Sequence, residues 1–100
     1  MTTTRRLRVL LADDHPIVRA GLRVLLESRG IDVAGEASDG LAAVEQATRT
    51  RPAVVVMDLS MPGLDGFAAT QRILRAVPEA RVLVLTTYAS EADALRAMDA

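Results

Sequence analysis

The sequence predicts an α/β protein, a doubly wound parallel sheet with helices on both faces. Four short apolar runs of strand length alternate along the chain with amphipathic segments of helix length. The runs at residues 8–12 and 53–57 are almost continuously apolar, which is typical of strands buried on both faces of a parallel sheet. Right-handed crossovers between such strands place helices on both sides of the sheet.

The first unit pairs a strand at 8–12 with a helix at 16–29. Pro16 suits the first turn of that helix, where a backbone N–H has no intrahelical partner. Gly30 is expected to end it. Helical spacing predicts an inward face made of Ile17, Gly21, Leu22, Val24 and Leu25.

The second unit contains a weakly alternating strand at 31–37 and a helix at 41–49. Ser38, Asp39 and Gly40 form the turn and N-cap between them. Pro52 ends the unit, because the residue before a proline disfavours helix. The inward positions of the helix are predicted to be Leu41, Val44 and Ala47.

The third strand, at 53–57, leads directly into Asp58, and glycine and proline break the chain before a helix at 67–76. The core candidates of that helix are Phe67, Ile73 and Leu74. A fourth buried strand is predicted at 81–86. Ser90 is the expected cap of a fourth helix that continues to residue 100.

The composition predicts one folded domain and excludes several classes of protein. The 100 residues are half hydrophobic and a quarter charged, with a net charge of −1. The twelve cations, all arginines, are scattered, so no concentrated basic surface for nucleic acid is expected. The chain has no cysteine, and charges interrupt every window of membrane-spanning length. These features predict a cytoplasmic protein without a disulfide framework or membrane contact.

Acidic side chains follow two of the predicted strands. Asp13 and Asp14 come after the first strand, Asp58 closes the third, and Thr86 closes the fourth. Carboxyl ends of parallel strands meet at one edge, where ligands of such sheets bind. Crowded carboxylates repel without a cation, and hard oxygen ligands suit Mg²⁺. The edge is therefore predicted to be a magnesium and phosphoryl site, although Asp13 and Asp14 alone are equally compatible with helix capping.

Three segments carry a family resemblance: LLADDHPIVRAGL, VVVMDLSMPGLDG and VLVLTTY, in this order and at these spacings. Together they resemble the receiver domain of two-component response regulators. DDHPIVRAGL is typical of the NarL/FixJ family, whose output domain is of the LuxR type. The resemblance implies a flavodoxin-like sheet of order 2-1-3-4, truncated before the fifth strand, with the fifth βα unit missing.

The resemblance also implies roles for site residues. Asp58 matches the phosphoacceptor, which takes a phosphoryl group from the phosphohistidine of a sensor histidine kinase. Mg²⁺ is expected on Asp13, Asp14, Asp58 and the main-chain carbonyl of Ser60. Thr86 matches the switch hydroxyl. Such a domain is a signalling switch that catalyses only its own phosphoryl transfer and dephosphorylation, and is not an enzyme with turnover.

The same resemblance sets expectations about domains and partners. Residues 1–100 are interpreted as a receiver domain that is incomplete at its C-terminus and lacks the lysine that receivers carry after their fifth strand. A helix-turn-helix domain is expected downstream, so transcription regulation and DNA binding would belong to the full-length protein. A homodimer on phosphorylation is also expected.

Two other functions remain open. The first is an interaction or adaptor fragment that is not phosphorylated. The second is a Mg²⁺-dependent phosphatase of the haloacid dehalogenase type, which would need an acid where Ser60 stands. His15, the single histidine, is interpreted as a solvent-facing loop residue outside the site, and Asp65 and Gly66 as scaffold.

Overall fold

The computed structural model describes residues 6–59, 61 and 65–85. In these ranges strands and helices alternate, each within one residue of its predicted bounds. The elements are β1 (Arg8–Ala12), α1 (Pro16–Ser28), β2 (Asp32–Ala37), α2 (Gly40–Thr50), β3 (Val54–Asp58), α3 (Gly66–Ala76) and β4 (Arg81–Leu85). The fourth predicted helix and its cap at Ser90 lie outside the described residues.

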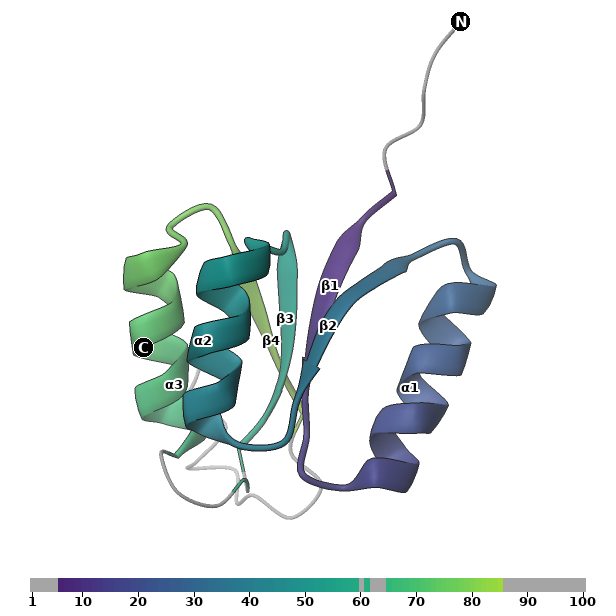
Figure 1. The fold of residues 1–100 in the computed structure, drawn as a ribbon, viewed down its shortest axis with the longest axis horizontal. Helices are drawn as coiled ribbons and strands as arrows, with labels where there is room; N and C mark the ends of the chain where they lie inside the picture. The colour runs from purple at the N-terminus through teal and green to yellow at the C-terminus, as the bar shows by residue number, and fades with distance from the viewer. Residues whose placement is uncertain (1–5, 60, 62–64, 86–100) are drawn as a thin grey trace, which may run out of the picture.

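The strands form one parallel sheet in the order β2-β1-β3-β4, which is the order that the family resemblance implies. Figure 1 shows α1 on one face of the sheet and α2 with α3 on the other, so the fold is a doubly wound α/β sheet. The chain leaves β1 toward one neighbour and returns to pair on its other side with β3. In such sheets ligands bind beyond the carboxyl ends of the strands where the strand order reverses, which here are the ends of β1 and β3 at the lower edge of the sheet in Figure 1.

Two apolar layers cover the faces of the sheet. On β1, Leu10 and Ala12 belong to the cluster beneath α2 and α3, whereas Val9 and Leu11 belong to the cluster beneath α1. Neighbouring residues of a strand point to opposite faces, so the continuous apolar run is buried on both sides. The interpretation of this run as an interior strand is confirmed. Rigid packing of β1 and β3 fixes the positions at which their carboxyl ends emerge.

The predicted inward face of α1 is largely wrong. Ile17 is 88% exposed, Val24 is 69% exposed and Leu25 is half exposed, whereas Leu22 and Leu26 pack on the sheet. At about 100° per residue, Ile17 and Val24 lie on the side of the helix opposite to Leu22 and Leu26. The apolar residues of α1 cover most of its circumference, and sequence spacing alone does not select the buried stripe.

Two further burial predictions need correction. Leu41, predicted to face inward from α2, is 54% exposed, whereas Ala47 of the same helix is fully buried. The strand β4, predicted to be buried, lies at the edge of the described sheet, and its Leu83 is 56% exposed. Among the described residues β4 pairs only with β3, which leaves its other edge without a strand partner. In α3, Ile73 is fully buried as predicted, and Phe67 and Leu74 are partly buried.

Aspartates cap two of the helices. The carboxylate of Asp39 accepts a hydrogen bond from the backbone N–H of Ala42 at 2.7 Å, and that of Asp65 accepts one from Ala68 at 2.8 Å. Both bonds satisfy donors that a helix leaves free in its first turn. Gly30, just past α1, has a φ of +79°, which glycine adopts without steric cost. In the described part of the chain, no helix has the length and apolar character needed to cross a membrane.

Candidate metal site

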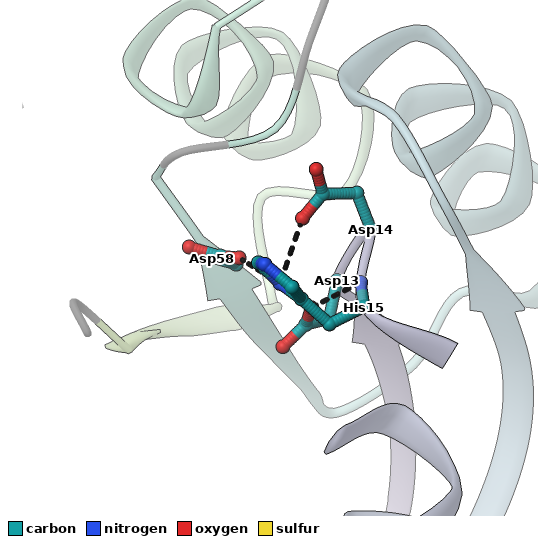
Figure 2. Close-up of side chains that lie close together, drawn as sticks. All are labelled: Asp13, Asp14, His15 and Asp58. Atoms are coloured by element: carbon teal, nitrogen blue, oxygen red, sulfur yellow. Dashed lines mark hydrogen bonds and ion pairs between the residues drawn. The ribbon is translucent and has the colours of Figure 1, made fainter. Parts of the chain in front are cut away.

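Three carboxylates at the ends of two neighbouring strands meet at one edge of the sheet. Asp13 and Asp14 follow β1 directly, and Asp58 is the last residue of β3, which pairs with β1. One ligand atom from each, together with one from His15, lies within 4.8 Å of all the others. Figure 2 shows the four side chains pointing toward one another. The structure thus brings together the acids that the sequence places at this edge.

Burial makes this cluster electrostatically demanding. Asp13 is 5% exposed and Asp58 is 2% exposed, while the side chain of Asp14 is 28% exposed. Withdrawing charged carboxylates from water is costly unless a cation or hydrogen-bond donors compensate them. The Oδ1 atom of Asp14 is buried and accepts no hydrogen bond among the described residues, although it pairs with Nδ1 of His15 at 2.9 Å. An oxygen in this position is suited to a metal ion or another positive group.

His15 is part of this cluster, which corrects its placement outside the site. The side chain is half exposed, as a loop role predicts, but its ring turns inward (Figure 2). Its Nδ1 atom lies 3.0 Å from Oδ1 of Asp13, 2.9 Å from Oδ1 of Asp14 and 3.6 Å from Oδ2 of Asp58. The hydrogen bond with Asp13, followed by the charge of Asp14, raises the pKa of His15 above its usual value. The sequence feature that could have indicated this placement is the position of His15 directly after Asp13 and Asp14.

The main chain of Asp13 is held at both of its polar groups. Its N–H donates to the carbonyl of Ala37 at 3.0 Å, and its carbonyl accepts a hydrogen bond from the guanidinium of Arg19 at 2.7 Å. Arg19 also donates through Nε to Glu36 on β2 at 2.8 Å, and Arg23 binds the other oxygen of the same carboxylate. Glu36 therefore anchors, through Arg19, the loop that carries the acid pair. The sequence pattern of the helix did not indicate this role for either arginine.

Glu36→Gln is expected to destabilise the fold by about 1 kcal/mol at neutral pH, because the partly exposed pair with Arg19 is screened by solvent. Burial alone would raise the pKa of Glu36, but the hydrogen bonds from Arg23 and Arg19 outweigh it and lower that pKa. The stabilisation is therefore full above the usual glutamate pKa of about 4.3 and disappears as the pH falls through the lowered value. Denaturant unfolding at several pH values measures this difference.

The matched control is Glu79→Gln. Glu79 pairs with Arg51 at 2.7 Å, but both side chains are more than half exposed, and neither contacts the loop after β1. This variant is expected to lose less stability than Glu36→Gln at neutral pH. Equal losses in the two variants, or a Glu36→Gln deficit that persists in acid, would contradict the anchoring role.

The residues present suit Mg²⁺. Carboxylate oxygens from Asp13, Asp14 and Asp58 are hard ligands, and they converge at a place where the Asp14 side chain is partly exposed to solvent. Asp13 and Asp58 are buried, and a bound cation would compensate their negative charge. Ser60 and Thr86, the other predicted site residues, lie outside the described residues.

Comparison with protein families identifies close relatives. Residues 9–100 match the response regulator receiver domain. The chain is 47% identical to the transcriptional regulatory protein LiaR of Bacillus subtilis over 83 residues, which cover 82% of this chain and 39% of LiaR. The chain therefore spans about two fifths of that relative.

Solved structures agree with these matches. A two-component response regulator of the LuxR family from Aurantimonas is 43% identical, with a TM-score of 0.87 over 95% of this chain and 69% of that one. The isolated REC domain of RcsB from Salmonella enterica, determined in the presence of the phosphomimetic BeF₃⁻, is 34% identical. Its TM-score is 0.84 over 95% of this chain and 72% of that one.

Proposed function

The chain belongs to the response regulator receiver domain family of two-component systems, and from this premise we propose that Asp58 is its phosphoacceptor. One observation carries the proposal. The Asp58 carboxylate stands at the carboxyl end of the buried strand β3, beside the acid pair that follows β1. This is the place in a doubly wound sheet where ligands bind. The RcsB receiver with its phosphomimetic supports the same chemistry in a relative.

Asp58 would act as a nucleophile. A carboxylate oxygen forms a bond to phosphorus while the bond between phosphorus and the nitrogen of a kinase phosphohistidine breaks. The leaving imidazole keeps the electron pair of that bond, and the product on this chain is an acyl phosphate. Because β3 is packed on both faces, the carboxylate is held in place before the donor arrives.

The acid pair would hold the metal that this transfer requires. Asp13 and Asp14 supply carboxylate oxygens, Asp58 supplies a third, and the family resemblance adds the carbonyl of Ser60. When bound, Mg²⁺ offsets the negative charge on the phosphoryl oxygens. The hydrogen bond from Arg19 to the Asp13 carbonyl keeps the acid pair oriented toward Asp58. The family resemblance assigns the switch hydroxyl to Thr86.

The proposal extends to partners. The phosphodonor would be a sensor histidine kinase of the cytoplasm, and phosphorylation would favour a homodimer. LiaR is a transcriptional regulatory protein more than twice the length of the matched segment, so DNA binding is assigned to a C-terminal helix-turn-helix domain outside residues 1–100. The receiver itself is a switch, because the phosphoryl group ends on its own side chain.

Incubation with a small acyl phosphate tests the function. The intact mass of the chain is expected to increase by one phosphoryl group in the presence of Mg²⁺ and to remain unchanged when the metal is chelated. Folding is checked in both samples by circular dichroism, so that a missing adduct cannot be attributed to unfolding.

Two other results would overturn the proposal. A folded chain that takes up no phosphoryl group with Mg²⁺ would support a non-phosphorylated adaptor. Release of many equivalents of phosphate without an adduct would support the phosphatase, although Ser60 stands where that family needs a general acid.

A further inference from the structure

The His15 ring occupies a position suited to a metal ligand. Ligand atoms that are neighbours around an octahedral ion lie about 3 Å apart when each bond is about 2.1 Å. The Nδ1 atom of His15 lies 3.0 Å and 2.9 Å from the nearest oxygens of Asp13 and Asp14, and 3.6 Å from Oδ2 of Asp58. In the structure these contacts are a hydrogen bond and ion pairs of the ring, and they bring Nδ1 to about the distance from the Asp13 and Asp14 oxygens that neighbouring ligands of one ion would have.

A backbone hydrogen bond of the loop, in addition to the contacts of the ring, keeps His15 beside the cluster. The backbone N–H of His15 donates to Oδ1 of Asp13 at 2.8 Å, which fixes the start of the side chain beside the carboxylates. His15 is the N-cap residue of α1, but its side chain makes no capping hydrogen bond. The imidazole therefore does not cap the helix, and metal binding would replace the proton on Nδ1 and the hydrogen bond that this atom forms with Asp13.

We propose that His15 is a direct ligand of the bound metal, so that the site binds Co²⁺ or Ni²⁺ more tightly than a purely carboxylate site would. The inference rests on the metal site of the proposed function and adds a ligand to it. Imidazole nitrogen favours the later divalent transition metals, whereas Mg²⁺ gains little from replacing an oxygen ligand by nitrogen. His15 therefore determines which ion the site prefers, and Mg²⁺ binding itself depends on the carboxylates.

Proton NMR of the Co²⁺-loaded chain, prepared without a histidine tag, tests the ligand directly. Protons of an imidazole bound to Co²⁺ are shifted far outside the ordinary spectral range. Because the chain has a single histidine, one set of shifted ring signals is expected. This experiment needs no variant, so it does not depend on how a substitution affects folding.

Calorimetric titration with Co²⁺ and Mg²⁺ measures the selectivity. His15→Gln is expected to weaken Co²⁺ binding about tenfold or more, since even indirect partners of metal ligands change affinity by about 10–100-fold. Its Mg²⁺ affinity should change less than threefold. Asp14→Ala, the control for location, should lose affinity for both ions.

The outcomes separate this inference from the proposed function. Absence of shifted ring signals while Co²⁺ is bound, or equal or tighter binding of both ions by His15→Gln, would overturn the ligand role. Tighter binding by the variant would mean that the ring competes with the metal for the carboxylates. A wild-type chain that binds no Co²⁺ would overturn it as well. Mg²⁺-dependent phosphorylation is measured separately, so the proposed function can stand when the His15 inference fails.

Discussion

An Asp58→Asn variant is expected to remain folded and to take up no phosphoryl group from a small phosphodonor. The amide has nearly the same shape as the carboxylate and fits the same buried position at the end of β3. It lacks the negative charge and the nucleophilic oxygen that the transfer needs. Removing one of three adjacent carboxylates also reduces their mutual repulsion, so the thermal midpoint should be at least that of the wild type. Intact mass and thermal unfolding measure the two effects.

Asp65→Asn is the matched control for this loss. Asp65 is an exposed aspartate that caps α3, and asparagine caps a helix about as well as aspartate does. This variant should form the adduct at the wild-type stoichiometry. An Asp58→Asn chain labelled as fully as the Asp65→Asn chain would exclude Asp58 as the phosphoacceptor.

Gly66→Ala is expected to destabilise the domain by about 1–3 kcal/mol, the usual cost of overpacking. A methyl group at this position would lie 2.8 Å from Cα of Leu59 and 3.2 Å from the carbonyl oxygen of Asp58. Both are backbone atoms, so the chain after β3 would have to move. The preference of helices for alanine over glycine, at most about 1 kcal/mol, acts in the opposite direction and is smaller. Displacement of the Asp58 backbone should also slow phosphorylation at temperatures where the variant is folded.

Gly21→Ala is expected to stabilise the domain, in contrast to Gly66→Ala. Gly21 lies in α1, and a methyl group there meets no atom within 4 Å. Helix propensity alone then predicts a gain of about 0.5–1 kcal/mol. Chemical unfolding of both variants measures the contrast. Equal changes in stability at the two positions would show that the close contact between Gly66 and the backbone of Asp58 and Leu59 does not restrict the residue at this position.

Features that depend on neighbouring residues were predictable from the sequence. The strand bounds follow from local apolar runs, and the caps at Asp39 and Asp65 follow from local turn chemistry. The convergence of Asp13, Asp14 and Asp58 was also predictable, because a parallel sheet brings the carboxyl ends of its strands to one edge.

Features that depend on residues distant in the chain were not predictable from the sequence. Glu36 is seventeen positions from Arg19, and nothing in the local pattern pairs them across α1 and β2. The buried stripe of α1 depends on how the helix rotates against the sheet, which its many apolar residues leave undetermined. The direction of the His15 ring depends on three carboxylates meeting first, so its place after the acid pair indicated proximity without orientation.

The central claim is that the phosphoryl group resides on Asp58, and chemical trapping tests it most directly. Borohydride reduces an aspartyl phosphate to homoserine, which marks the modified residue permanently for peptide sequencing by mass spectrometry. We expect homoserine in place of Asp58 after treatment with phosphodonor and Mg²⁺, and aspartate retained at residues 13 and 14. Homoserine at either of those positions, or a phosphoryl group on His15 with Asp58 unmodified, would contradict the account.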